Sequence, residues 1–154
     1  MVTEEELRSK SFKCTLSDKP SYKVSKEEAD RFKQMRAALP RKLHEVLAAW
    51  TKETGVQLTN STLGEMCRTN EKTIREYLNT KRAITRQFLY KLTIGLQLSL
   101  DQADELFELC GGILDPDSTF EDFIVYKAII DKDDIDSFVE EYNKLVVDGS
   151  KIKV

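Results

Sequence analysis

Histidine and cysteine are scarce in this 154-residue chain, which limits the metal and redox chemistry that it can support. His44 is the single histidine, and the three cysteines, Cys14, Cys67 and Cys110, stand far apart with no CxxC pair. Structural zinc sites use closely spaced pairs of such residues. We therefore expect no metal, no cofactor and three reduced thiols, with Cys67 and Cys110 acting as small apolar residues in helix cores.

Long apolar runs are also missing, as are the familiar signatures of catalytic sites. No apolar run approaches the roughly 18–20 residues that a membrane helix needs. The N-terminus, MVTEEELRSK, lacks the basic start and apolar stretch of a signal peptide. We expect a cytoplasmic protein with no membrane partner. The chain has no HExxH, no glycine-rich phosphate loop and no nucleophile elbow, so we expect no enzymatic activity.

The net charge of −3 conceals an uneven distribution along the chain. Residues 68–91 contain seven basic and two acidic residues, whereas residues 101–141 contain fourteen acidic and two basic residues. The basic stretch suits a nucleic-acid partner, and the acidic stretch suits a basic protein partner. An ordinary solvated surface is the second interpretation of the acidic stretch, and the charge pattern alone does not choose between the two.

Only three prolines and six glycines interrupt the chain, which favours an all-α protein with short loops. Polar capping residues precede the apolar runs and predict where helices begin. Because proline disfavours helical geometry in the residue before it, the first helix should end before Pro40 and a second should begin there. The predicted helices cover 26–38, a stretch from Pro40 to about 54, 60–67, 71–78, 86–96, 100–110, 119–131 and 135–147. The predicted caps are Ser25, Thr59, Asn70, Thr85, Ser99, Ser118, and either Asp133 or Asp134.

Residues 1–24 show a different pattern, in which apolar and polar residues alternate on both sides of a turn at 17–21. This alternation predicts a small β-hairpin. An isolated hairpin is marginal in water, so the segment must pack against something or stay mobile. It is also compatible with a fragment of a larger preceding domain.

The most informative stretch is residues 58–81, LTNSTLGEMCRTNEKTIREYLNTK. Two very short helices joined by a tight turn cannot each bury a face alone, so they must pack against each other and against flanking helices. In the second helix, Ile74, Tyr77 and Leu78 are expected to face inward. The residues expected to face outward near its N-terminus are Glu71, Lys72, Arg75 and Glu76.

This pattern resembles the Cro/repressor (XRE) family of helix-turn-helix DNA-binding regulators, over about residues 41–110. The resemblance implies an all-α, lambda-repressor-like five-helix domain that reads the major groove of double-stranded DNA with the helix at about 71–78. The segment LQLSLDQADEL looks like the family's entry into its fifth helix. The matching residues are Leu58-Thr59-Asn60, Leu63-Gly64, Thr73-Ile74 and Asn79-Thr80-Lys81.

The resemblance also implies roles for individual residues. Lys72 and Arg75 would donate to guanine O6 and N7, and Glu71 or Glu76 would accept from a cytosine amine. Phosphate contacts would position the domain without reading sequence. The residues implied to bind phosphate are Asn60, Asn79, Lys81, Arg82 and Arg86, with Lys91 as a further positioning cation.

The sequence departs from the family pattern at three positions. Arg68 stands where the family usually has glycine, at a site that often needs positive φ. Thr80 replaces another usual glycine, although the neighbouring Asn79 tolerates the left-handed conformation. Gly64 replaces the usual alanine at the helix contact, where it permits close packing.

These observations divide the chain into three parts: residues 1–24, a helix-turn-helix domain with a leading helix at 25–110, and a helical extension at 111–154. The extension's helical pair either packs on the preceding domain or mediates dimerisation, and a homodimer is inferred from the family alone. The first functional hypothesis is a sequence-specific transcriptional regulator. The alternative is a protein-interaction module, antitoxin-like or accessory to a larger protein, that keeps the fold without tight DNA binding and uses the acidic surface of 101–141.

Overall fold

The computed structural model describes residues 25–147, 149, 151 and 152. The seven elements formed by these residues are all α-helices, and no strand occurs among them, which confirms the all-α class. The hairpin predicted for 1–24 lies outside the described residues. The chain divides into two compact units, Met1–Lys33 and Gln34–Val154.

The first described helix, α3, spans Lys26–Thr54 without a break, with Pro40 inside it. Ser25 and Glu28 form the predicted capping box, because each side chain accepts a hydrogen bond from the other residue's backbone N–H. The predicted break before Pro40 is wrong. Proline inside a helix costs about 3 kcal/mol. A continuous helix buries Leu39 and Leu43 on one face, at roughly 1.5–3 kcal/mol each, which offsets that cost.

Six shorter helices follow, and most of their predicted starts are correct. The hydroxyls of Thr59, Thr85 and Ser99 and the amide oxygen of Asn70 accept first-turn N–H groups, as expected. Two details differ or are now decided: Thr119 rather than Ser118 caps its helix, and Asp134 rather than Asp133 caps the last one. The helices are α4 (Asn60–Met66), α5 (Glu71–Leu78), α6 (Arg86–Gly95), α7 (Leu100–Phe107), α8 (Phe120–Asp131) and α9 (Ile135–Leu145).

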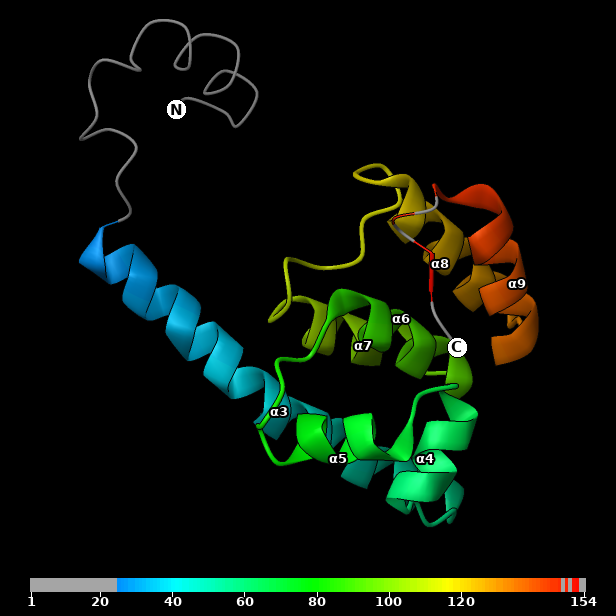
Figure 1. Cartoon of the computed structure of the whole chain (residues 1–154), viewed down its shortest axis with the longest axis horizontal. Helices are drawn as coiled ribbons and strands as arrows, with labels where there is room; N and C mark the ends of the chain where they lie inside the picture. Colours follow the sequence, from blue (N-terminus) through cyan, green and yellow to red (C-terminus); the bar gives the residue numbers. More distant parts are fainter. Residues whose placement is uncertain (1–24, 148, 150, 153–154) are drawn as a thin grey trace, which may run out of the picture. The chain divides into compact units, whose positions relative to one another are not determined.

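Helix α6 is the centre of the second unit, with α7, α8 and α9 packed against it (Figure 1). Every residue from Phe88 to Ile94 is buried, so α6 presents apolar atoms on all sides. Trp50 of α3 is buried, as expected, and its indole N–H donates to the carbonyl oxygen of Leu96 at 2.9 Å. The C-terminal pair α8 and α9 therefore packs on the preceding helices, which was one of the two expectations for it.

Four helices in this unit end with a left-handed residue that is not glycine. Arg68, Thr80, Gln97 and Lys132 have φ between 49° and 66°. Each helix end has a Schellman geometry, in which the following N–H reaches back to a carbonyl in the last turn, as from Thr69 to Gly64 at 2.8 Å. The sequence predicted such a conformation at Arg68. At the next helix end Thr80 carries it (φ 66°), and Asn79, which tolerates that conformation, does not.

Candidate nucleic-acid interface

Helices α4 and α5 pack closely because glycine occupies the contact between them. A Cβ atom added at Gly64 would lie 2.6 Å from the carbonyl oxygen of Thr69, which confirms the predicted close packing. A second approach was not predicted: a Cβ at Gly95 of α6 would lie 2.2 Å from the carbonyl oxygen of Met66. The backbones of α4, its turn and α6 therefore touch at two points where a side chain would not fit.

Helix α5 is held on its inner face and at its C-terminal end. Ile74 and Tyr77 are buried, and Leu78 is half-buried, in line with the predicted inward face. The Tyr77 ring packs against Phe88 of α6, with ring centroids 4.6 Å apart. His44 of α3 places its Nε2 atom 2.9 Å from the Leu78 carbonyl oxygen. These contacts fix the helix and leave its opposite face to solvent.

That opposite face carries three of the four predicted base-reading residues. Glu71, Lys72 and Arg75 are exposed, and their side chains have no hydrogen-bond or ion-pair partner within the described part of the chain. Because Lys72 and Arg75 are three residues apart on a helix, they lie on the same face. Asn70 caps this end of α5, accepting from the Lys72 N–H at 2.7 Å.

The fourth predicted base reader, Glu76, has a different environment. Its carboxylate lies 2.8 Å from the Arg82 guanidinium, and the Glu76 side chain is only 22% exposed. In the loop between them, the Asn79 side chain accepts from the Lys81 N–H at 3.1 Å. Asn79 thus fixes the loop through its side chain, beside Thr80 in the left-handed conformation. Lys81 and Arg82 remain exposed on this ordered loop.

Asn60, the predicted phosphate contact on α4, is the first residue of that helix and is half-buried. It follows Thr59, whose hydroxyl accepts from the Thr62 N–H at 3.0 Å. Because α4 packs on α5, Asn60 and the exposed residues of α5 stand on two helices in direct contact.

Arg86 does not belong to this group, and its assignment to phosphate is corrected. Its guanidinium donates to both carboxylate oxygens of Asp122, with Nη2 to Oδ2 at 2.7 Å, and to the carbonyl oxygens of Cys110 and Gly112. Asp122 is buried and also accepts from the Tyr90 hydroxyl and the Asp115 N–H. Arg86 therefore joins α6 to the start of α8.

Charge and hydrogen bonding set the protonation of this cluster. Burial works against ionisation of Asp122, but the hydrogen bonds from Arg86, Tyr90 and Asp115 outweigh it and lower the pKa of the carboxyl group. Burial raises the pKa of the Tyr90 hydroxyl, and its hydrogen bond to Asp122 adds to that shift. The pair is therefore an ionised arginine–aspartate bridge at neutral pH.

Lys91 also lies away from the exposed face of α5. It is 8% exposed, and its ammonium donates to the Arg68 carbonyl oxygen at 3.1 Å. Burial lowers the pKa of Lys91. Arg68 in turn forms an ion pair of 2.6 Å with Asp136 of α9. Lys91 is three residues after Phe88 and four before Gly95, so helical spacing could have indicated that it faces inward. No local signal indicates the contact of Arg68 with Asp136.

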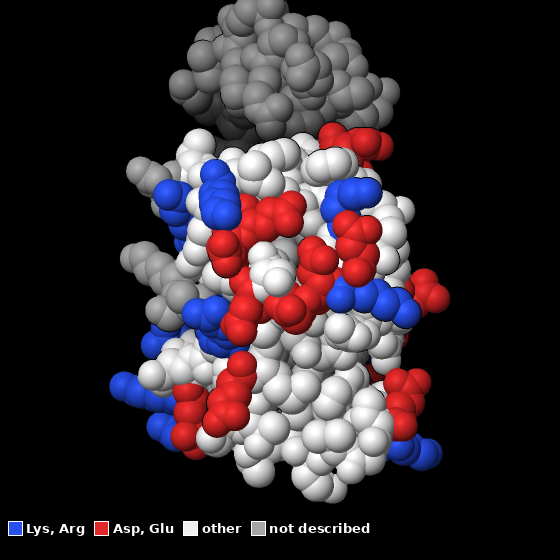
Figure 2. Space-filling model, turned by 90° about the vertical axis from the view of Figure 1, so that its right-hand side faces the viewer, with Lys and Arg blue, Asp and Glu red and all other residues white. Residues whose placement is uncertain are grey.

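The acidic residues of 101–141 gather partly on one surface. Figure 2 shows Asp and Glu side chains clustered at the height of α8 and α9. We call this the α8–α9 acidic surface. We define it by the exposed acidic residues of α8, α9 and the turn between them: Asp131, Asp134, Asp136, Glu140 and Glu141. Two of these are already paired, Asp136 with Arg68 and Glu140 with Lys144.

Other site classes have little support in the part of the chain that the structure describes. No group of three or more histidine, cysteine or acidic residues there could hold a metal ion. Cys67 and Cys110 are buried free thiols, each just beyond a helix end, and burial raises the pKa of Cys67 to about 12. No helix among these residues combines the length and apolarity needed to cross a membrane.

Comparison with known proteins adds no relative: no family model, curated protein or solved structure matches the chain.

Proposed function

We propose that this chain binds double-stranded DNA as a Cro/repressor-type helix-turn-helix regulator, with α4 and α5 as the two helices of the motif. The observation that carries the proposal is the exposed pair Lys72 and Arg75, which has no partner among the described residues and stands on a short helix whose other face is buried. Side chains near the start of a surface helix are the ones that reach base edges in the major groove. Glu71 offers an acceptor beside them.

In this proposal the residues around α5 bind the phosphate backbone of the DNA. Lys81 and Arg82 present cations on a loop that hydrogen bonds keep in one conformation, and such cations position a protein on phosphates. Asn60 and Asn79 supply neutral polar groups at the two ends of the motif. The ion pair with Arg82 makes Glu76 an orienting residue in this proposal rather than a base reader. Dimerisation remains a prediction from the family resemblance.

The decisive experiment measures fluorescence anisotropy of a labelled pool of random duplex DNA at increasing salt. We expect affinity to fall steeply, with a log–log slope of about −0.9 for each phosphate neutralised. Lys72→Ala/Arg75→Ala should weaken and broaden sequence selection. Lys81→Ala should reduce the salt slope by about one and weaken all sequences alike.

A charge-matched control is available in Lys52→Ala/Lys127→Ala, which removes two exposed lysines from α3 and α8. This variant should bind as the wild type does. If the wild type binds no tighter than about 10⁻⁴ M even at low salt, DNA binding is ruled out. Equal losses in the two double variants would show that only net charge matters, and sequence-specific binding through α5 would be rejected.

A protein-binding module is the second candidate, and the α8–α9 acidic surface is the observation that favours it. Its exposed carboxylates suit a basic partner. Replacing Asp134, Glu140 and Glu141 with the corresponding amides should leave DNA binding unweakened while abolishing capture of a lysine-rich peptide. Peptide binding that survives this triple replacement would exclude the acidic surface as its site.

A further inference from the structure

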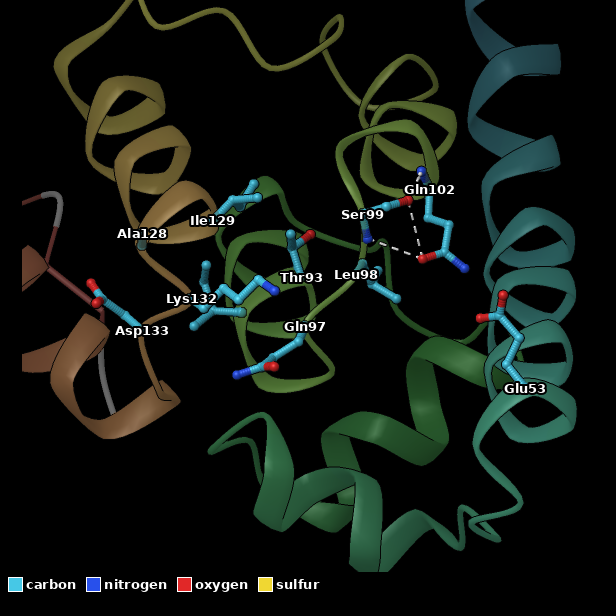
Figure 3. A pocket seen from close by; sticks show the side chains of 11 residues that line it. Glu53, Thr93, Gln97, Leu98, Ser99, Gln102, Ala128, Ile129, Lys132 and Asp133 are labelled. Atoms are coloured by element: carbon cyan, nitrogen blue, oxygen red, sulfur yellow. Dashed lines mark hydrogen bonds between the residues drawn. The ribbon is translucent and has the colours of Figure 1, made fainter.

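A cavity of about 560 Å³ opens between the C-terminal ends of α6 and α8 and the start of α7, away from the exposed face of α5 (Figure 3). Sites for small molecules usually have volumes of roughly 300–1,000 Å³. The backbone around this cavity is well ordered by hydrogen bonds. Ser99 and Gln102 form a complete capping box at the start of α7, and the end of α8 closes with the Asp133 N–H bonded to the Ala128 carbonyl oxygen.

A buried hydroxyl without a partner lies in the wall of this cavity. Thr93 of α6 is 1% exposed, and its Oγ1 atom has no hydrogen-bond partner. Among the described residues it is the one buried side-chain oxygen or nitrogen in that condition. Buried polar groups in native proteins are almost always hydrogen-bonded, and an exception calls for an explanation. A ligand in the cavity would supply the missing partner.

A cation stands near this hydroxyl. Lys132 follows α8 in the left-handed conformation, and Figure 3 shows its side chain extending into the ring of cavity residues that includes Thr93. The Lys132 ammonium has no ion-pair or hydrogen-bond partner within the described residues. The two carboxylates of the lining, Glu53 and Asp133, do not pair with it.

The rest of the lining is mixed, with the polar residues Gln97, Ser99 and Gln102 beside one aliphatic wall. Ile94, Leu98 and Ala128 are buried, and Ile129 packs against the core from α8. The cavity therefore offers one cation and one unpaired hydroxyl beside an aliphatic wall. Because the lining has one cation and two carboxylates, it favours an anion only where the anion lies against Lys132, and it disfavours a dianion such as a phosphate monoester.

We propose that this cavity binds a small carboxylic acid with an apolar body. The ligand carboxylate accepts from the Lys132 ammonium and the Thr93 hydroxyl, and the body lies against Leu98, Ala128 and Ile129. The site is independent of DNA binding and holds whether or not α5 contacts DNA. A simple acid and a zwitterionic amino acid share this chemistry, and only the amino acid places an ammonium group near Asp133 or Glu53.

The test is saturation-transfer NMR and calorimetry on the full chain, with hexanoate, phenylacetate, L-leucine and L-phenylalanine as probes and hexanamide as the uncharged counterpart. We expect at least one of the acids to bind and hexanamide to bind about tenfold more weakly. Tighter binding of leucine than of hexanoate would assign the site to amino acids. The reverse order would assign it to simple acids.

Three variants distinguish a loss of ligand binding from a loss of fold stability. Lys132→Gln should weaken the acid about tenfold, and Thr93→Val should weaken it several-fold without lowering the melting temperature of the unliganded protein, because it removes an unpaired hydroxyl. Lys127→Gln, on the exposed face of α8, should change nothing. The proposal is overturned if no acid binds at about 10 mM, if hexanamide binds as well as hexanoate, or if Lys132→Gln and Thr93→Val leave the affinity unchanged.

Discussion

Replacing Asp122 with asparagine should destabilise the fold by about 3 kcal/mol, which can be derived from its hydrogen bonds. Oδ1 accepts from Arg86 Nε and the Tyr90 hydroxyl, and Oδ2 accepts from Arg86 Nη2 and the Asp115 N–H. Asparagine has one carbonyl oxygen, and its NH₂ group is a donor. If the NH₂ group takes the Oδ1 position, the Tyr90 hydroxyl can turn to accept from it, and only the hydrogen bond from Arg86 Nε is lost. In the opposite orientation the NH₂ group faces Arg86 Nη2 and the Asp115 N–H, and both hydrogen bonds are lost.

The size of the loss follows from the kind of bonds involved. The hydrogen bond lost in the better orientation is charge-assisted, at about 1.5–3 kcal/mol, and the bonds that remain are weakened because their acceptor is no longer ionised. The Arg86 charge also loses its counter-ion, although its partial exposure to solvent moderates that penalty. The assay is urea unfolding followed by Trp50 fluorescence, with the midpoint and slope measured for wild type and variant.

Asp117→Asn is the matched control, because Asp117 is exposed in the same connecting segment and its substitution should cost under about 0.5 kcal/mol. A double-mutant cycle of Asp122→Asn with Tyr90→Phe should give a coupling energy of about 0.5 kcal/mol or more. If Asp122→Asn costs less than about 1 kcal/mol, the four-donor description of this carboxylate is refuted.

Three further predictions concern acid sensitivity and helix ends. The pKa of Asp122 is lower in the folded protein than its ordinary value, so its ionised form stabilises the fold above the ordinary pKa. That stabilisation is lost as the pH falls through the folded pKa. Asp122→Asn should therefore flatten the acid side of a plot of unfolding free energy against pH. Thr80→Gly should stabilise the fold by about 0.5 kcal/mol, because the strain of a left-handed β-branched residue exceeds the entropy that glycine adds to the unfolded chain. A lower melting temperature of the variant would contradict this. Gly95→Ala should lower the free energy of unfolding in urea by more than about 2 kcal/mol, because its Cβ would meet the Met66 carbonyl oxygen. Gly149→Ala is the control, since a Cβ there meets nothing. Equal losses in the two variants would show that the backbone at Gly95 shifts at little cost.

Local signals in the sequence predicted most of the helices. Capping residues and apolar spacing act over three or four positions, so Thr59, Asn70, Thr85 and Ser99 marked helix starts that the structure confirms. Pro40 shows the limit of such rules. Its local preference is outweighed by burial of the α3 face, which depends on helices distant in the sequence.

The sequence predicted the exposure of some candidate site residues but not the intramolecular partners of others. The outward positions of Lys72 and Arg75 follow from the periodicity of α5. The fate of Arg86 does not, because its partner Asp122 is 36 positions away and belongs to another helix. A basic residue in a basic stretch resembles a phosphate ligand until its intramolecular acceptors are known. The pairing of Arg68 with Asp136 has the same origin.

The two glycines at the helix contacts have a consequence for recognising relatives of this protein. Gly64 and Gly95 each face a backbone oxygen at a distance that excludes any side chain, and thirty residues separate them in the chain. Surface cations can change freely during divergence, whereas these two positions cannot change without moving three backbones. A distant homologue should therefore keep this glycine pair and its approximate spacing after its exposed residues have become unrecognisable, and a search pattern built on the pair would be more sensitive than one built on the basic residues of α5.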